Sequence, residues 1–200
     1  MFALRYLNTV EEKIVAVLDQ TETIKKAAEM ITRAVTGGNS VYLVDTQGII
    51  DAEMVDRASG LVLFRSLKDS RQKLTEGDVL IISTYYPEDE RDFNYLNEAH
   101  ASGASVITIS PSGKLSGNAD VALVNNSDIQ NGIYSAYGID RPFCPVSGFV
   151  NAVMAWSLAA ETAALLLAQG KTPTVYWGEY LVGGKEQRTE ARRRFIANGY

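Results

Sequence analysis

The stretch that most constrains the fold of this chain is residues 77–87, GDVLIISTYYP, in which an apolar run of strand length ends in two hydroxyl residues. A segment typical of a helix follows over about 88–102, and a second apolar run occupies 104–110. Strand, helix and strand in this order predict a β-α-β unit with parallel strands. Ligands bind at the carboxyl ends of the strands in such sheets, so the hydroxyl residues mark the expected ligand face.

The same alternation continues along the chain. Strands are predicted at 40–44, 61–64, 78–83, 104–109 and 120–124, and helices at 49–59, 88–102 and 146–169. Residues 8–36 have helical apolar spacing and form either one helix or two with a break near Gln20. The predicted strands are almost continuously apolar, as expected when helices cover both faces of a sheet. The pattern predicts an α/β fold, a three-layer α/β/α sandwich with a flavodoxin-like sheet of five parallel strands.

We expect residues 1–187 to form a single domain with additional N-terminal helices. Residues 188–200 form a charged C-terminal tail, which is either a terminal helix against a partner subunit or a solvated, frayed end.

Composition narrows the class of protein. The chain has 200 residues, of which 46% are hydrophobic, and 19 basic against 24 acidic side chains give a net charge of −5. This balance argues against a nucleic-acid partner. We identify neither an apolar run of membrane-spanning length nor a secretory signal, so no membrane partner is expected. The single cysteine, Cys144, cannot form an internal disulfide, and a cytoplasmic location is expected.

The order of the elements resembles the sugar isomerase (SIS) domain, a phosphosugar-binding module. The stretches that carry the likeness are residues 38–44, 52–61, 74–83, 98–110 and 119–123. The resemblance covers about residues 5–187 and is closest to uncharacterised bacterial SIS proteins labelled phosphoheptose isomerases, in which a proline- and glycine-bearing segment follows a long C-terminal helix. It implies a sugar phosphate or related small-molecule ligand and a homo-oligomer, and no cofactor is expected.

Two turns depart from the pattern of SIS domains. The Gly-x-Gly-x-Ser type of turn after the first strand is replaced by DTQG at 45–48. The S-x-S-G type of turn after the third strand is replaced by STYYPEDE at 83–90, which keeps the first two hydroxyls and adds acidic residues. These acids oppose a bound dianion, but they also suit the positive end of a helix dipole.

Candidate ligand-binding residues follow the predicted strands or open the long helix: Asp45, Thr46, Gln47, Ser83, Thr84, Ser110, Ser112, Ser147 and Asn151. A phosphate held without metal needs backbone N–H groups and hydroxyl donors. Ser83 and Thr84 either supply such donors or satisfy the backbone of their own turn.

Catalytic residues are left open, with Asp45 and Glu53 as the candidates. Asp45 either binds a sugar hydroxyl, acts as a base or caps the helix at 49, and Glu53 is otherwise expected in an ion pair. His100, the only histidine, is expected at the opposite edge of the sheet. No metal-ligand spacing or nucleotide-binding motif is present.

Sequence therefore predicts a phosphosugar-binding relative of the sugar-phosphate isomerases with altered phosphate loops, whose own catalysis is undecided. The first alternative is a non-catalytic SIS scaffold with a structural or regulatory role. The second is an enzyme that uses Asp45 or Glu53 on a non-phosphorylated ligand.

Overall fold

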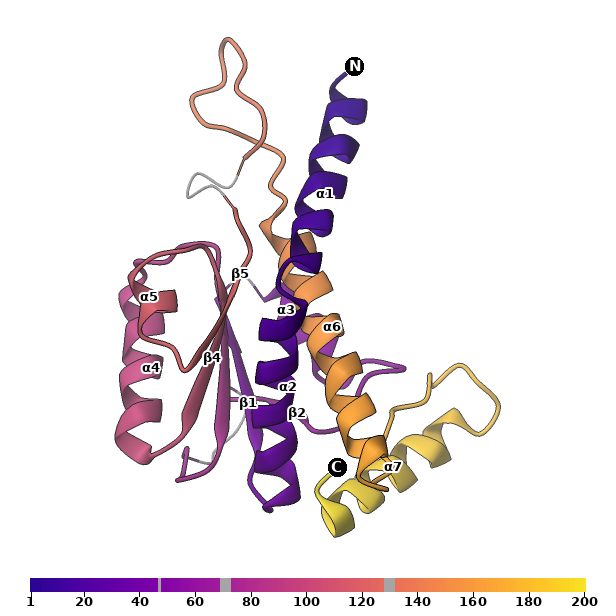
Figure 1. Cartoon of the computed structure of the whole chain (residues 1–200). Coiled ribbons are helices and arrows are strands. Elements are labelled where there is room, and N and C mark those ends of the chain that lie inside the picture. Colours follow the sequence, from indigo (N-terminus) through magenta and orange to yellow (C-terminus); the bar gives the residue numbers. More distant parts are fainter. Residues whose placement is uncertain (47, 69–72, 128–131) are drawn as a thin grey trace.

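A computed structural model describes residues 1–46, 48–68, 73–127 and 132–200. Its centre is a sheet of five parallel strands in the order β2-β1-β3-β4-β5 (Figure 1). The strands are β1 Val41–Asp45, β2 Phe64–Ser66, β3 Val79–Ser83, β4 Ser105–Ser110 and β5 Val121–Val124. The expected α/β fold with a flavodoxin-like parallel sheet is confirmed. The chain reverses its direction of travel across the sheet between β1 and β3, and ligand crevices open at such a switch point.

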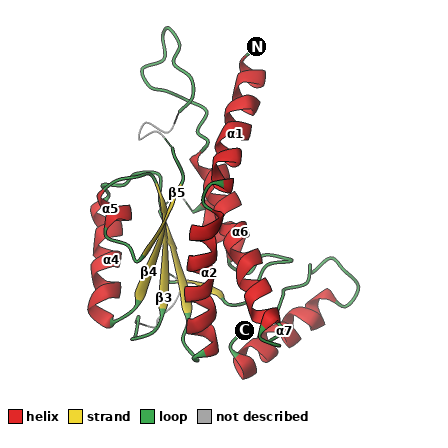
Figure 2. Ribbon diagram, in the orientation of Figure 1, coloured by secondary structure: helices red, strands yellow, loops and turns green. Residues whose placement is uncertain are grey.

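Helices cover both faces of the sheet (Figure 2). They are α1 Phe2–Leu18, α2 Thr21–Thr36, α3 Ile49–Met54, α4 Glu90–Ser102, α5 Lys114–Gly117, α6 Ser147–Ala168 and α7 Gly184–Asn198. The helices α2, α3 and α6 pack together over one face, and α4 packs on β3 and β4 from the other. Part of α1 extends past the sheet beside the loop that leads to α6 (Figure 1).

The break between α1 and α2 falls near Gln20, one of the two arrangements expected from the sequence. Gln20 pairs with β5 like one more strand residue: its Nε2 donates to the Val124 carbonyl at 2.6 Å, and its Oε1 accepts from the Val124 N–H at 2.7 Å. An amide side chain with both functions can satisfy an open strand edge in this way. The pairing fixes the chain reversal against the sheet.

Alternation along the strands divides the core into two clusters. Leu43, Ile81 and Ile109 belong to the cluster beneath α2 and α6. Val44, Ile82 and Val106 belong to the cluster that includes Leu96 and Ala99 of α4. Since successive side chains point to opposite faces, the last residues of β1 and β3 point toward α3 and α6, and the residues that follow lie on the α4 side.

The second strand differs from the expected span of 61–64. Leu61 and Val62 instead run beside the segment after α6, where the Val62 N–H donates to the Thr174 carbonyl at 3.0 Å. The sheet pairing starts only at Phe64. The apolar run at 61–64 thus pairs first with residues 174–175 and then with β1, and its composition did not predict this change of partner.

The long helix α6 contradicts our expectation that the chain has no apolar run of membrane-spanning length. By length and composition α6 is able to cross a membrane. In this structure it packs against α1, α2 and α3, and nine of its residues are buried. Those nine residues face the interior of the domain, whereas other apolar residues of α6, Phe149 and Leu167 among them, are exposed.

Residues 188–200, expected as a charged tail, form most of α7. Ala191 and Phe195 of this helix are buried in the core. The Arg65 guanidinium lies 4.9 Å from the centre of the Phe195 ring. Arg192 donates to the Asp56 carboxylate at 3.0 Å. The segment is thus a terminal helix that packs on the core of its own chain, and its expected contact with a partner subunit stays a prediction.

Candidate functional site

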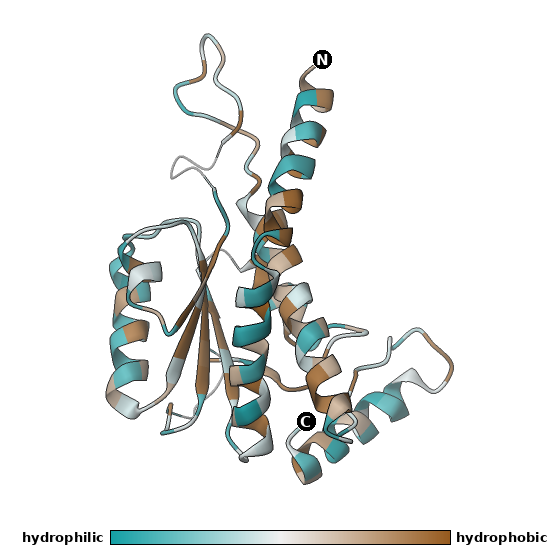
Figure 3. Ribbon diagram, in the orientation of Figure 1, coloured by the Kyte–Doolittle hydropathy of each residue, from teal (hydrophilic) through white to brown (hydrophobic). Residues whose placement is uncertain are grey.

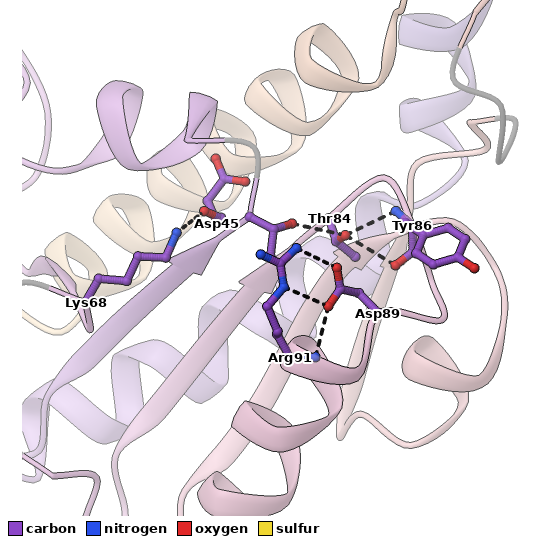
Figure 4. A network of polar contacts seen from close by, with 7 residues as sticks. Asp45, Lys68, Thr84, Tyr86, Asp89 and Arg91 are labelled. Atoms are coloured by element: carbon purple, nitrogen blue, oxygen red, sulfur yellow. Dashed lines mark hydrogen bonds and ion pairs between the residues drawn. The ribbon is translucent and has the colours of Figure 1, made fainter. Parts of the chain in front are cut away.

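The carboxyl edge of β1, β3 and β4 brings together most of the polar residues singled out in the sequence. Asp45 and Ser83 are register partners at the ends of β1 and β3. The next residues are also in contact, since the Thr46 hydroxyl donates to the Thr84 hydroxyl at 3.3 Å (Figure 4). Gln47 lies outside the described residues.

A buried network of side chains holds the start of the β3–α4 turn. Asn151 Nδ2, in α6, donates to the Ser83 hydroxyl at 3.1 Å. Asn151 Oδ1 accepts from Asn125 Nδ2 at 2.7 Å, and both amides lie 3.4 Å from the Thr84 carbonyl. All four side chains are at most 1% exposed. Satisfied buried networks of this kind rigidify the backbone they support.

Asn125 is a residue of this network that the sequence analysis missed. It follows β5 directly and is joined to the end of β4 by its N–H, which donates to the Ser110 carbonyl at 3.0 Å. The sequence could have indicated Asn125, because a polar residue that directly follows a predicted strand lies at the same edge of the sheet as the other candidates.

Thr84 shapes the turn through its own backbone. Its hydroxyl accepts from the Tyr86 N–H at 3.1 Å and lies 3.3 Å from the Tyr86 carbonyl (Figure 4). This is the local turn bonding expected of Ser and Thr. In this conformation the Thr84 side chain positions the turn instead of projecting from it.

Asp45 occupies the capping role that was one of its three expected functions. Its side chain is fully buried, and Oδ2 accepts from the Ile50 N–H at 2.6 Å, in the first turn of α3. The ammonium group of Lys68 donates to the Asp45 carbonyl (Figure 4). Lys68 is exposed and supplies a cation at this edge. The sequence analysis missed it, although it follows β2 as the other site residues follow their strands.

The amino end of α4 carries its own anion. Asp89 caps the helix: Oδ1 accepts from the Arg91 N–H at 2.9 Å, and the Arg91 guanidinium adds bonds of 3.0 and 2.7 Å. The hydrogen bonds from Arg91 lower the pKa of Asp89. The N–H groups of Asp92 and Phe93 donate to the Asp89 carbonyl. Part of the helix terminus that an external phosphate would use is thus engaged by residue 89.

Asp92, in the same helical turn, is in a different situation. Its side chain is completely buried, and neither carboxylate oxygen has a hydrogen-bond partner of normal geometry among the described residues. Burial raises the pKa of Asp92 to about 6; the nearby Thr84 hydroxyl and Arg91 act in the opposite direction, and Asp89 and Asp45 reinforce the rise. The sequence analysis did not single out this residue.

The remaining candidates occupy varied positions. Ser110 is buried at the end of β4, Ser112 is exposed in the next turn, and Ser147 is buried in the first turn of α6. Glu53 lies 3.6 Å from Arg57 in an ion pair. His100 Nε2 lies 3.4 Å from Asp120 Oδ2, near the amino end of β4, so it is far from the polar edge, as expected. Within the described ranges, no three acidic, histidine or cysteine side chains are grouped to hold a metal ion.

A large apolar groove of about 890 Å³ adjoins this edge. Ile49 and Glu53 of α3 line it on one side, and Phe149, Val153 and Trp156 of α6 line it on the other. The two helices approach closely because residue 148 is glycine: a Cβ there would lie 2.4 Å from Ile49 Cδ1. Glu53 is therefore on the wall of the groove, away from the Asp45–Ser83 pair.

The chain is similar in sequence to two curated bacterial proteins. No family model matches the chain. A "UPF0309 protein" of Geobacillus thermodenitrificans is 24% identical, over 96% of this chain and 92% of that protein. Another from Brucella anthropi is also 24% identical, over 87% of each chain.

Among solved structures, a phosphoheptose isomerase from Francisella tularensis superposes with a TM-score of 0.60 at 14% identity, over 81% of this chain and 98% of that one. The sugar isomerase domain of an RpiR transcription factor from Sphaerobacter thermophilus gives a TM-score of 0.53 at 14% identity, over 98% of both chains. The resemblance to SIS domains is confirmed at the level of the fold.

Proposed function

We propose that this chain binds a sugar phosphate at the carboxyl edge of β1, β3 and β4. The observation that carries the proposal is the buried Ser83–Asn151–Asn125 network, which holds the Thr84 turn at the switch point of the sheet. Pre-organised turns at helix amino ends suit phosphate groups, since their backbone N–H groups are fixed before the ligand arrives. The exposed Lys68 adds a cation for the phosphate, and solved neighbours with this fold include sugar-phosphate isomerases.

In the proposed mode of binding, some residues support the turn and others contact the ligand. Ser83, Thr84 and Asn151 hold the turn from beneath, whereas Thr46, Lys68, Ser112 and the turn backbone contact the ligand. The buried Ser110 and Ser147 support the same edge. Loss of a supporting residue then weakens binding by loosening the turn, even though the residue itself does not contact the phosphate.

We do not expect substantial isomerase activity. Aldose–ketose isomerisation needs an acid–base group that moves a proton between adjacent carbons. Asp45 is buried and engaged with the Ile50 N–H, Glu53 lies on the groove wall beside Arg57, and His100 is at the other edge. The test is solvent-deuterium exchange into aldose and ketose phosphates, followed by NMR. Exchange that disappears in Asp45→Asn or Glu53→Gln would overturn this part and identify the base.

A regulatory or structural role is the second candidate function. The sugar isomerase domain of a transcription factor shares this fold, so the fold also occurs outside free-standing enzymes. Such a role is compatible with ligand binding without turnover. We further propose a cytoplasmic protein without nucleic-acid contacts of its own, consistent with the net charge of −5.

We also propose that two copies of the chain associate through the groove between α3 and α6. The same chain has an exposed apolar ridge on one face of α1, where Leu4, Leu7, Val15 and Leu18 are each more than half exposed. Figure 3 shows apolar segments on both α1 and α6. An apolar ridge and an apolar groove on one chain suit self-association. A monomer by light scattering at micromolar concentration would remove this proposal.

A thermal-shift screen against sugar phosphates tests ligand binding directly, since a bound ligand raises the melting temperature. The double variant Ser83→Ala/Thr84→Ala should lose the ligand-induced shift. Thr108→Val is the matched control, because it removes a buried hydroxyl of β4 that has no hydrogen-bond partner within the described chain. Unchanged ligand affinity in the double variant would move the site elsewhere.

A further inference from the structure

The buried carboxyl of Asp92 is the feature that the proposed binding site leaves unexplained. Buried carboxylates are almost always hydrogen-bonded or paired with a cation, because an isolated buried charge is costly. Asp92 has no exposed surface, and both of its oxygens lack a partner among the described residues. It is the third residue of α4, and it lies near the turn that Thr84 shapes, since the Thr84 hydroxyl acts to lower its pKa.

The charged groups that act on Asp92 come from two elements. At the start of its own helix, Asp89 raises the pKa of Asp92 and Arg91 lowers it, and these two side chains are joined to each other in a two-bond pair. From β1, the Asp45 carboxyl is a second anion near it. Arg91 is engaged by Asp89, so the charge of Asp92 is left without a dedicated counter-ion.

A phosphate that docks on this turn therefore meets a second negative charge. Two anions that share a poorly solvated site cannot both remain fully charged without a large cost, and the usual result is proton uptake by one of them. A phosphate monoester has a second pKa of about 6 and can also take the proton. The position of Asp92, near the turn and shielded from water, makes its carboxyl the internal acceptor.

We propose that Asp92 determines which charge state of the complex forms, so that an anionic sugar binds at the β3–α4 turn only together with one proton held on this carboxyl. The inference rests on the proposed function, since it concerns the same site. Asp92 is a specificity-determining residue in this account: it sets the net charge that the turn accepts and does not contact the sugar.

The experiment compares the wild-type chain with Asp92→Asn by titration calorimetry at pH 5 and pH 8. The probes are glucose 6-phosphate and glucose 6-sulfate, because the sulfate ester stays a monoanion over this range and cannot itself supply the pH dependence. At pH 8 the variant should bind both esters about a hundredfold more tightly than the wild type, because with a pKa of about 6 only about one wild-type carboxyl in a hundred is then protonated. At pH 5 the two proteins should agree, because the wild-type carboxyl is then largely neutral. Glu98→Gln, which removes an exposed charge from the same helix, is the control and should behave as the wild type.

Proton uptake provides a second measurement that needs no variant. Binding of glucose 6-sulfate to the wild type near pH 7, measured in two buffers of different ionisation enthalpy, should take up a large fraction of one proton. Identical pH profiles for wild type and Asp92→Asn, or binding without proton uptake, would overturn the inference while leaving sugar-phosphate binding intact. If neither protein binds any sugar phosphate at either pH, the proposed function fails and this inference fails with it.

Discussion

Two buried aspartates at opposite edges of one sheet show how differently this chain uses the same side chain. At the amino edge, Asp78 precedes β3 and is 4% exposed; it accepts from the Ser40 N–H at 2.8 Å and from the Thr75 N–H and hydroxyl at 2.9 Å. At the carboxyl edge, Asp92 is fully buried and neither oxygen has a partner among the described residues. At the amino edge the Asp78 carboxylate accepts hydrogen bonds that stabilise the fold. At the carboxyl edge the Asp92 carboxyl lacks hydrogen-bond partners among the described residues.

The contrast extends to the neighbours of each residue. Asp120, also at the amino edge, accepts from the Val106 N–H at 2.7 Å and lies beside His100. At the carboxyl edge, the Asp45 carboxyl accepts from the Ile50 N–H, yet it adds a like charge near Asp92. Folding alone favours satisfied polar groups, and an unsatisfied buried carboxyl costs more than an unsatisfied hydroxyl such as that of Thr108, so Asp92 calls for an explanation beyond folding. This difference is an independent reason to look for function at the carboxyl edge.

The largest effect is expected at the amino edge. Asp78→Ala removes three hydrogen bonds and leaves two backbone N–H groups without their acceptor, which should lower the free energy of unfolding by about 3 kcal/mol. Urea denaturation followed by circular dichroism measures the loss. Asp78→Asn, which keeps one acceptor oxygen, should lose less. A loss below about 1 kcal/mol for the alanine variant would show that these bonds are not what stabilises this edge.

At the carboxyl edge the change in the free energy of unfolding should have the opposite sign. Asp92→Asn removes a charge that the fold holds without a counter-ion, and at pH 8 it should raise the free energy of unfolding by about 2 kcal/mol. The folded-state pKa of about 6 lies above the ordinary value of 3.8, so folding favours the protonated carboxyl. The wild type is therefore most stable relative to the variant below about pH 4 and loses that stability as the pH rises through 6.

Urea unfolding of the two proteins at pH 4, 6 and 8 tests this dependence. The difference between them should grow with pH over this range. An Asp92→Asn variant that is less stable than the wild type at pH 8 would mean that the carboxylate has a favourable partner in solution, and the contrast between the two edges would disappear.

Most of the fold could be predicted from the sequence because its signals are local and repeated. Buried parallel strands are apolar runs that end in turn residues, and five of them occur in order. The spans shifted where a tertiary partner decided the outcome: the run from Leu61 pairs first with the segment near Thr174 and joins the sheet only at Phe64. Such long-range pairing leaves no local trace.

The candidate site was predicted only in outline. Strand ends located Asp45, Ser83 and Thr84, but not whether these side chains face the ligand or the interior. Asp92 was not singled out, and only the acids at 88–90 were assigned to the positive end of the helix dipole. Its signal was nevertheless present: Asp92, Leu96 and Ala99 are spaced as one buried stripe of α4, and a carboxyl on such a stripe is an anomaly.

Thr84→Val tests how much the turn at the carboxyl edge contributes to stability, and it is measured at pH 4, where the Asp92 carboxyl is largely protonated. The hydroxyl accepts from the Tyr86 N–H, and its loss leaves that group to the solvent at the partly exposed turn. We expect a loss of about 1 kcal/mol in the free energy of unfolding. The thermal shift induced by sugar phosphates should fall by more than this loss explains, because the turn is then less well positioned. An unchanged ligand-induced shift would mean that the Thr84 hydroxyl does not organise the site.

The smallest effect is expected for Thr108→Val, in the middle of β4 between the two edges. The Thr108 hydroxyl is fully buried and has no hydrogen-bond partner in the described parts of the chain. Valine has nearly the same shape and is favoured in buried strands, and it exchanges an unsatisfied hydroxyl for a methyl group. The free energy of unfolding should therefore change by no more than about 0.5 kcal/mol, in the stabilising direction. Urea denaturation beside Thr84→Val gives a matched pair in which the same atoms change and only the hydrogen bond differs. If both variants lose stability equally, the cost belongs to the removal of any buried hydroxyl, and the turn at Thr84 has no special role.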